Sequence, residues 1–149
     1  MWIDDRGSEL LPIPECRRLL ALGAKVGLHG HLGITKEGAP LVLPVDYAAD
    51  GSDVVIRIGE HLFGDVDGEL AAFQVDNSNY EQAADGTVAE GRWSVLVRGL
   101  VTELPDQPAE LDLPHPQVAE PGHRLVRVRG DVVTGRRLRR PTESGQAGS

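Results

Sequence analysis

The chain has 149 residues, with 23 acidic and 15 basic side chains that give a formal charge of −8 at pH 7. This length suits one domain with a single core, and the negative charge opposes binding to nucleic acid or to an anionic membrane surface. The single cysteine, Cys16, excludes an intrachain disulfide and suits a reducing compartment. With no export signal and no apolar run long enough to span a membrane, the sequence predicts a cytoplasmic protein.

The first predicted element is a short helix over residues 14–22. It has a proline suited to the first turn, an acidic residue beside the positive helix end and one apolar stripe, and it is expected to end at Gly23. Cys16 falls on the apolar stripe, which favours a small buried hydrophobic residue over a reactive thiol. Residues 1–12 have no periodicity and are predicted to run over the surface.

Alternating apolar and polar residues predict β-structure along most of the remaining chain. The predicted strands are residues 26–34, 40–49, 53–58, 69–76, 91–104 and 123–133. Short turns that contain glycine join the first three strands into an antiparallel meander. Single helical turns are expected over residues 60–65 and 109–113. Six strands leave two edges to protect, and closure into a small barrel removes both.

The clearest strand pattern lies in residues 91–104. Trp93 and Val95 point to one side, which is predicted to be a core face. The other side mixes Ser94 and Arg98 with leucines, which suits a wall that packs on another surface and also contacts a polar ligand. Because a barrel of this size fills with side chains, any ligand is expected outside it, between subunits.

Other segments are predicted to lack regular structure. Residues 77–90 form a long polar connection, and prolines make residues 105–121 irregular. Residues 139–149 have the composition of a disordered tail. The folded domain is therefore expected over residues 1–138.

Several segments, taken together in their order and spacing, indicate a family resemblance. They include Leu43-Pro44-Val45-Asp46-Tyr47, Val54-Val55-Ile56-Arg57, Ala72-Phe73-Gln74-Val75-Asp76 and Trp93-Ser94-Val95-Leu96-Val97-Arg98-Gly99. On these segments, residues 14–138 resemble the pyridoxamine 5'-phosphate oxidase-like flavin-binding split barrels, particularly the small bacterial branch with nitroimidazole-resistance-type proteins. The resemblance implies a mainly β, six-stranded antiparallel split barrel, a homodimer, and FMN or a deazaflavin bound at the subunit interface.

The resemblance also implies which residues contact the flavin. The implied phosphate-binding residues are Arg57, Ile58, Gly59 and His61; the residues along the isoalloxazine ring are Pro44, Val45 and Asp46; and the ring or edge contacts are Trp93 and Ser94. Arg57 suits a phosphate because a guanidinium can donate two parallel hydrogen bonds to it. Glu60 lies in the same turn, where a lysine is expected in this family, and its carboxylate would repel a phosphate dianion.

The leading hypothesis is an FMN- or deazaflavin-dependent oxidoreductase that acts on a small organic substrate. Glu60 motivates a second hypothesis, a split barrel that binds a flavin or tetrapyrrole without turnover, or that has no cofactor. His29 and His31 stand two residues apart on one strand face and motivate a third, a cupin-like metal barrel. That barrel needs a third ligand, such as His61 or His123.

Two of the implied contacts have simpler alternatives. Trp93 can pack in the core or in an interface, and Arg57 can be a solvated or ion-paired strand arginine. No catalytic residue is assigned, although His29 or Tyr47 could act as an acid or base if it lies near the ring. Flavin chemistry resides in the cofactor, so a catalytic motif need not be visible.

Overall fold

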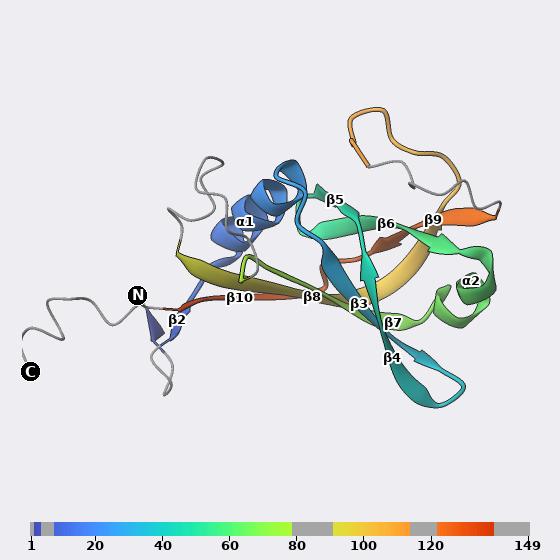
Figure 1. Ribbon diagram of the computed structural model, residues 1–149, viewed down its shortest axis with the longest axis horizontal. Helices are drawn as coiled ribbons and strands as arrows, with labels where there is room; N and C mark the ends of the chain where they lie inside the picture. The colour runs from blue at the N-terminus through green and yellow to red at the C-terminus, as the bar shows by residue number, and fades with distance from the viewer. Residues whose placement is uncertain (1, 4–7, 79–90, 114–121, 139–149) are drawn as a thin grey trace, which may run out of the picture.

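The computed structural model describes residues 2–3, 8–78, 91–113 and 122–138 (Figure 1). In chain order, the elements are β1 (Trp2–Ile3), β2 (Ser8–Leu10), α1 (Ile13–Lys25), β3 (Gly30–Lys36), β4 (Ala39–Val45), β5 (Tyr47–Asp50), β6 (Asp53–Gly59), α2 (Glu60–Val66), β7 (Leu70–Asp76), β8 (Arg92–Leu104), β9 (His123–Val128) and β10 (Val132–Leu138). The two helices lie at opposite ends of the strands (Figure 1). The predicted tail and most of the predicted connection over residues 77–90 lie outside the described residues.

The strands form two antiparallel sheets that share β8. The large sheet has the order β1-β2-β10-β8-β7-β3-β4, and the small sheet contains β5, β6, β9 and the end of β8. β8 has 13 residues, so it pairs with β7 and β10 along its first part and with β9 from Val101 to Leu104. The large sheet ends at β4 and the small sheet at β5, and only Asp46 separates these strands in the chain. We call the opening between these two edges the split.

A single large core fills the space between the two sheets and α1. Trp93, Val95 and Val97 are at most 3% exposed, so the predicted core face of β8 is confirmed. Tyr47 joins the core to the helix, because its hydroxyl donates to the main-chain oxygen of Leu20 at 2.6 Å. Burial raises the pKa of this phenol, so the hydroxyl stays protonated and keeps donating.

The prediction of a mainly β, antiparallel fold is confirmed, but six strands is too few, since the described residues contain ten. The predicted strand over residues 40–49 is wrong, because the chain breaks at Asp46 into β4 and β5, which lie in different sheets. Val45 and Tyr47 both pack against the core on either side of the break. The alternation therefore continues through it, which is why the pattern shows no boundary.

Four further segments differ from the prediction. The strand expected over residues 123–133 is two strands, β9 and β10, joined by a turn in which the Arg129 amide donates to the Leu100 oxygen at 3.0 Å. Residues 8–10 form β2 and pair with β10, although the sequence there has no alternation. α2 extends to Val66, beyond a single turn. Residues 109–113 form no helix, and the Leu111 amide closes a turn onto the Pro108 oxygen.

Gly23 does not end the first helix, which continues to Lys25. A Cβ atom at this position would lie 2.5 Å from the Tyr47 hydroxyl and 3.3 Å from the Trp93 ring. The glycine is therefore needed for close packing of the helix on the core, and not for a left-handed turn. The two uses of glycine look alike in a sequence, so the predicted end was three residues early.

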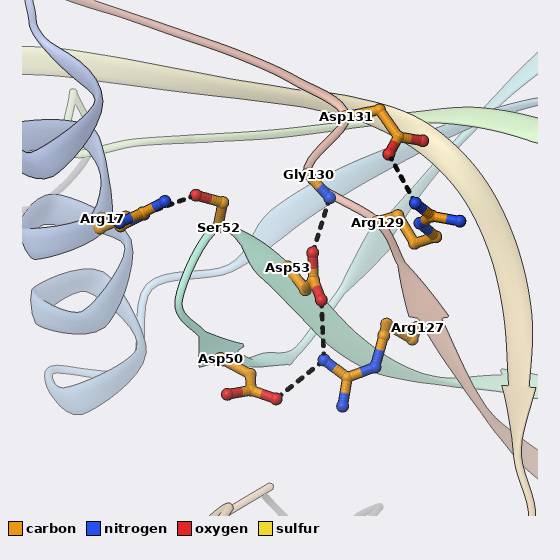
Figure 2. Close-up of polar contacts among 8 residues, drawn as sticks. All are labelled: Arg17, Asp50, Ser52, Asp53, Arg127, Arg129, Gly130 and Asp131. Carbon is orange, nitrogen blue, oxygen red and sulfur yellow. Dashed lines mark hydrogen bonds and ion pairs between the residues drawn. The ribbon is translucent and has the colours of Figure 1, made fainter.

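A polar corner fixes the small sheet against the turn between β9 and β10 (Figure 2). Asp53 accepts a hydrogen bond from the Gly130 amide at 2.7 Å, and Arg127 lies between Asp50 and Asp53, donating to them at 2.8 and 2.9 Å. On the other side of the same turn, Gly99 of β8 faces main-chain atoms. The corner therefore sets how sharply the chain bends from the small sheet back into the large one.

Gly99→Ala is expected to destabilise the protein, because the new Cβ would lie 1.9 Å from the Arg129 carbonyl oxygen, a main-chain atom that no rotamer change can move. The free energy of unfolding in urea should fall by about 1–3 kcal/mol or more. Gly64→Ala is the matched control, because no heavy atom lies within 4 Å of its added Cβ. Inside a helix this control should gain about 0.5–1 kcal/mol. Equal midpoints for the two variants would contradict the packing described at Gly99.

Candidate functional site

Two of the three segments implied in flavin binding adjoin at the split. Tyr47 and Ile56 form the last pair of the β5–β6 ladder, and Asp46 and Arg57 follow directly beyond that pair. Residues 44–46, which are the end of β4 and the residue after it, thus lie beside the end of β6. Pro44 and Asp46 are exposed there, while Val45 is half-buried against the core.

Arg57 lies on the outer face of the small sheet. Its neighbours on β6, Ile56 and Ile58, point into the main core, so Arg57 points the other way. Its guanidinium donates to the side-chain oxygen of Gln107 at 2.9 Å and lies 3.5 Å from the Leu113 oxygen. This predicted phosphate ligand therefore also contacts the segment that follows β8.

The turn after β6 places His61 over Gly59. A Cβ atom at Gly59 would lie 2.6 Å from the His61 ring, so the absence of a side chain leaves the space that the imidazole fills. His61 itself is exposed. Arg57 and His61 stand two residues before and two residues after Gly59, and both side chains carry N–H donors of the kind that bind an anionic group.

Glu60 does not stand as an isolated negative charge in this turn. Arg124 of β9 donates to both of its carboxylate oxygens at 2.9 Å, and the same guanidinium contacts Glu103 at 3.2 Å. It also lies 4.3 Å from the centre of the Phe63 ring. The repulsion expected between Glu60 and a phosphate is therefore partly offset by a cation that the sequence did not reveal.

The side chains of Ile58 and Trp93 lie in the core, with 3% exposure each. The structure therefore supports the core-packing alternative for Trp93, and only main-chain atoms at these two positions could contact a cofactor. The indole Nε1 of Trp93 has no hydrogen-bond partner among the described residues. Sequence alone did not separate the alternatives, because a tryptophan on a strand suits both a core and a stacking site.

Tyr47 is not available as an acid or base at the split. Its side chain is 2% exposed and its hydroxyl is bonded inside the core. His29 lies at the split instead, with its Nδ1 atom 2.7 Å from the Asp46 carboxylate. In the part of the chain that the structure describes, no three His, Cys, Asp or Glu side chains converge on a possible metal site. The metal-barrel hypothesis therefore finds no third ligand there.

Ser94 lies away from the split in the same chain. It is on the outer face of the large sheet, beside Asp76 on β7 and Arg136 on β10. Ser94 lies near the start of β8, whereas β9, the strand that joins β8 to β6 and Arg57, pairs with β8 only from Val101 to Leu104. The outer face that holds Ser94 is the mixed face predicted for β8.

The other end of this outer face is an apolar groove of about 500 Å³. The groove crosses five strands. One row of successive cross-strand partners runs through it: Val42, Gly33, Ala72, Arg98 and Val132. This groove was not predicted from the sequence. A usable signal was the run Ala39–Val45, which is apolar on both of its faces, as is typical of a strand covered on both sides.

Asp76 makes the polar end of the outer face sensitive to pH. Partial burial acts to raise its pKa, but hydrogen bonds from Gln74 at 2.7 Å and from Ser78, with His31 nearby, hold that pKa below its ordinary value. A lowered folded-state pKa means that the carboxylate contributes stability above its unfolded pKa of about 4 and loses it as the pH falls through the folded-state value.

Asp76→Asn is therefore expected to lower the free energy of unfolding at pH 7, by less than about 1 kcal/mol because solvent screens this partly exposed group. The difference from the wild type should shrink as the pH falls below the ordinary carboxyl value near 4 and through the lowered folded-state pKa. Urea unfolding of both proteins at pH 7, 5 and 3 measures it. A difference that stayed constant across this range would mean that the ionised form gains nothing from these hydrogen bonds.

No helix among the described residues is long and apolar enough to cross a membrane. Among curated proteins, none matches the chain. Several solved structures share its fold. Three of them are the FAD-binding protein from Mycobacterium smegmatis (23% identity, 89% of this chain and 99% of that chain, TM-score 0.61), an FAD-binding protein from Mesorhizobium loti (22%, 87% and 96%, 0.57) and a proposed 5-nitroimidazole antibiotic resistance protein from Bacteroides thetaiotaomicron (14%, 87% and 86%, 0.55).

Because the identities are below 25%, these structures establish the fold alone. The family is established by sequence, since the family model described as pyridoxamine 5'-phosphate oxidase matches residues 14–137. This match confirms the resemblance drawn from the strand segments, over nearly the same residues. The two predicted segments that meet at the split, residues 44–46 and 57–61, both lie inside the match. The chain belongs to the pyridoxamine 5'-phosphate oxidase family.

Proposed function

We propose that this protein binds a flavin at the split and uses it in the oxidation or reduction of a small organic substrate. The observation that carries the proposal is that Asp46 and Arg57 both follow the last pair of the β5–β6 ladder. The segment proposed to contact the flavin ring therefore adjoins the segment proposed to hold its phosphate. Family membership supports it, and two proteins of similar structure are described as FAD-binding. FMN is the first candidate, and a deazaflavin is the alternative.

The residues at the split suit the two ends of such a cofactor. Arg57 and His61 would hold the phosphate, with Glu60 kept from repelling it by Arg124. β4 is an edge strand, so main-chain groups near Val45 and Asp46 point away from β3 and can bond the polar edge of the ring. When bound, the flavin supplies hydride or electron transfer, and the protein supplies position and electrostatics.

We also propose that two copies of the chain associate through the outer face of the large sheet. Register places five of the exposed large apolar residues on this face: Leu10, Val42, Leu70, Val132 and Leu138, with exposures of 38, 64, 74, 46 and 55%. Monomers rarely expose so many apolar side chains on one side. Since Ser94 shares the face, association would bring it toward a site that includes the partner, as the family resemblance implies.

A second candidate function is flavin binding without turnover. It is favoured by the position of Tyr47, whose hydroxyl is bonded inside the core. Of the two acid–base candidates from the sequence, this leaves His29, which contacts Asp46. The two candidates differ in one measurement. Reduction of the bound flavin by a nicotinamide cofactor, followed by reoxidation with an organic acceptor, supports the oxidoreductase, whereas a flavin that stays oxidised supports the carrier.

The flavin site is tested by binding. FMN should raise the melting temperature and bind in a fluorescence titration, and Arg57→Ala should weaken FMN binding about 10- to 100-fold by removing a charged hydrogen bond to phosphate. Riboflavin, which has no phosphate, should lose little affinity. Arg18→Ala, an exposed arginine on α1, is the control and should leave FMN binding unchanged. If FMN, FAD and a deazaflavin all leave the melting temperature unchanged, the proposed function is wrong.

The dimer is tested by light scattering after gel filtration. Leu70→Lys places a charge on the most exposed apolar side chain of the groove and should convert a dimer into monomers at micromolar concentration. Ile13→Lys makes the same change at an exposed apolar residue of α1, outside this face, and should leave the dimer intact. A wild-type monomer, or an unchanged dimer in Leu70→Lys, would reject this face as the interface.

A further inference from the structure

The segment after β8 packs as a strap over the outer face of the small sheet. We use the name strap for residues 105–113. Leu111 and Leu113 are 8% and 3% exposed and form a second, smaller core with Ala48 and Val55. This burial anchors the C-terminal half of the strap to β5 and β6, next to Arg57.

Within the strap, both ends of the Gln107 amide are bonded. Its oxygen accepts from the Arg57 guanidinium at 2.9 Å, and its nitrogen donates to the main-chain oxygen of Leu111 at 2.9 Å. The Leu111 amide in turn donates to the Pro108 oxygen at 3.1 Å, which closes the turn that holds Gln107 in place. The side-chain amide of Gln107 is therefore held by the main chain of the strap as well as by the arginine.

The contacts that the strap makes with Arg57 differ in kind from those of neighbouring arginines. Arg124 and Arg127 bond to carboxylates, whereas the strap offers Arg57 an amide oxygen and a main-chain carbonyl. The two strap acceptors are uncharged, so these bonds themselves add no negative charge beside the guanidinium. A long side chain that is already held loses less conformational freedom when it binds an anion.

We propose that Gln107 is a positioning residue that holds the Arg57 guanidinium in the orientation in which it binds the phosphate of FMN. The inference rests on the proposed function, because it assumes that Arg57 is the phosphate ligand. The strap was predicted from the sequence only as a proline-rich, irregular segment. With this role for Gln107, the strap contributes to cofactor affinity. Gln107 contacts the arginine and not the cofactor.

Two substitutions at Gln107 separate positioning from simple support of the fold. Gln107→Ala removes the acceptor, and FMN affinity should fall about three- to tenfold. Gln107→Glu keeps an acceptor oxygen at the same length but adds a charge that competes with the phosphate, so FMN affinity should fall at least about tenfold. Riboflavin affinity should stay within about twofold in both variants, because riboflavin has no phosphate to respond to the charge. The ratio of FMN to riboflavin affinity is therefore the readout.

The matched control is Ala109→Glu, which adds the same charge to an exposed position of the same strap, two residues away. It should change the ratio of affinities by less than about twofold, since solvent screens an exposed charge that lacks contact with the guanidinium. Hydrogen exchange of residues 105–113 provides a second readout. Exchange should speed up more in Gln107→Ala than in Gln107→Glu, because glutamate loses the donation to the Leu111 oxygen but keeps the bond to Arg57.

The outcomes distinguish this assignment from the proposed function. If FMN binds and both Gln107 variants keep the wild-type ratio, or if Ala109→Glu lowers it as much as Gln107→Glu does, the positioning role is wrong and the flavin site stands. A rise in FMN affinity in Gln107→Ala would also overturn it, because the amide would then compete for Arg57. If the wild type binds neither FMN nor riboflavin, the proposed function fails, and the assignment of Gln107 fails with it.

Discussion

β8 belongs to both sheets, and the rest of the structure depends on how the chain passes from one to the other along it. Leu100 still pairs with β7, while the next residue, Val101, pairs with β9. At this passage the main chain of Arg129 approaches Gly99 so closely that no side chain fits between them. The polar corner around Asp53 holds the same turn from the other side. Sheet curvature is thus set by main-chain contacts, which have little freedom to adjust.

The split is the consequence of this curvature that matters for function. Because the sheets share one strand but end at different ones, β4 and β5 separate at Asp46 and leave an edge with main-chain groups turned outward. The end of β6 lies beside that edge and brings Arg57 and the Gly59 turn with it. A binding site between two edges needs no cavity inside the barrel, whose interior is filled by side chains.

Charge around the split is balanced locally. The chain as a whole is acidic, and a phosphate would meet a net repulsive field unless nearby carboxylates were paired. Arg124 pairs Glu60 and Glu103, and His29 contacts Asp46. These exposed pairs add little to stability. Their effect is to limit the negative potential near Arg57, whose contacts with the strap are to neutral oxygens.

The local residue pattern of the sequence predicted several features of the fold and indicated the family. The alternation of Trp93, Val95 and Val97 predicted the core face of β8, and the order of short strand segments was enough to indicate the family before any coordinates. Of the candidate site, Arg57 and residues 44–46 were implied by the family resemblance, and guanidinium chemistry agreed with a phosphate-binding role for Arg57. It also predicted a mixed outer face on β8, without showing how far that face extends.

Only the tertiary structure decided what depends on residues distant in the chain. It showed that Gly23 serves packing against Tyr47 and that Trp93 lies in the core. It also paired Glu60 with Arg124, 64 residues away, and Arg57 with Gln107, 50 residues away. The physical reason is that alternation reports which side of a strand is buried, but not which strand lies beside it. Partners and close approaches are fixed by how the sheets bend around β8, and that bend has no local signature.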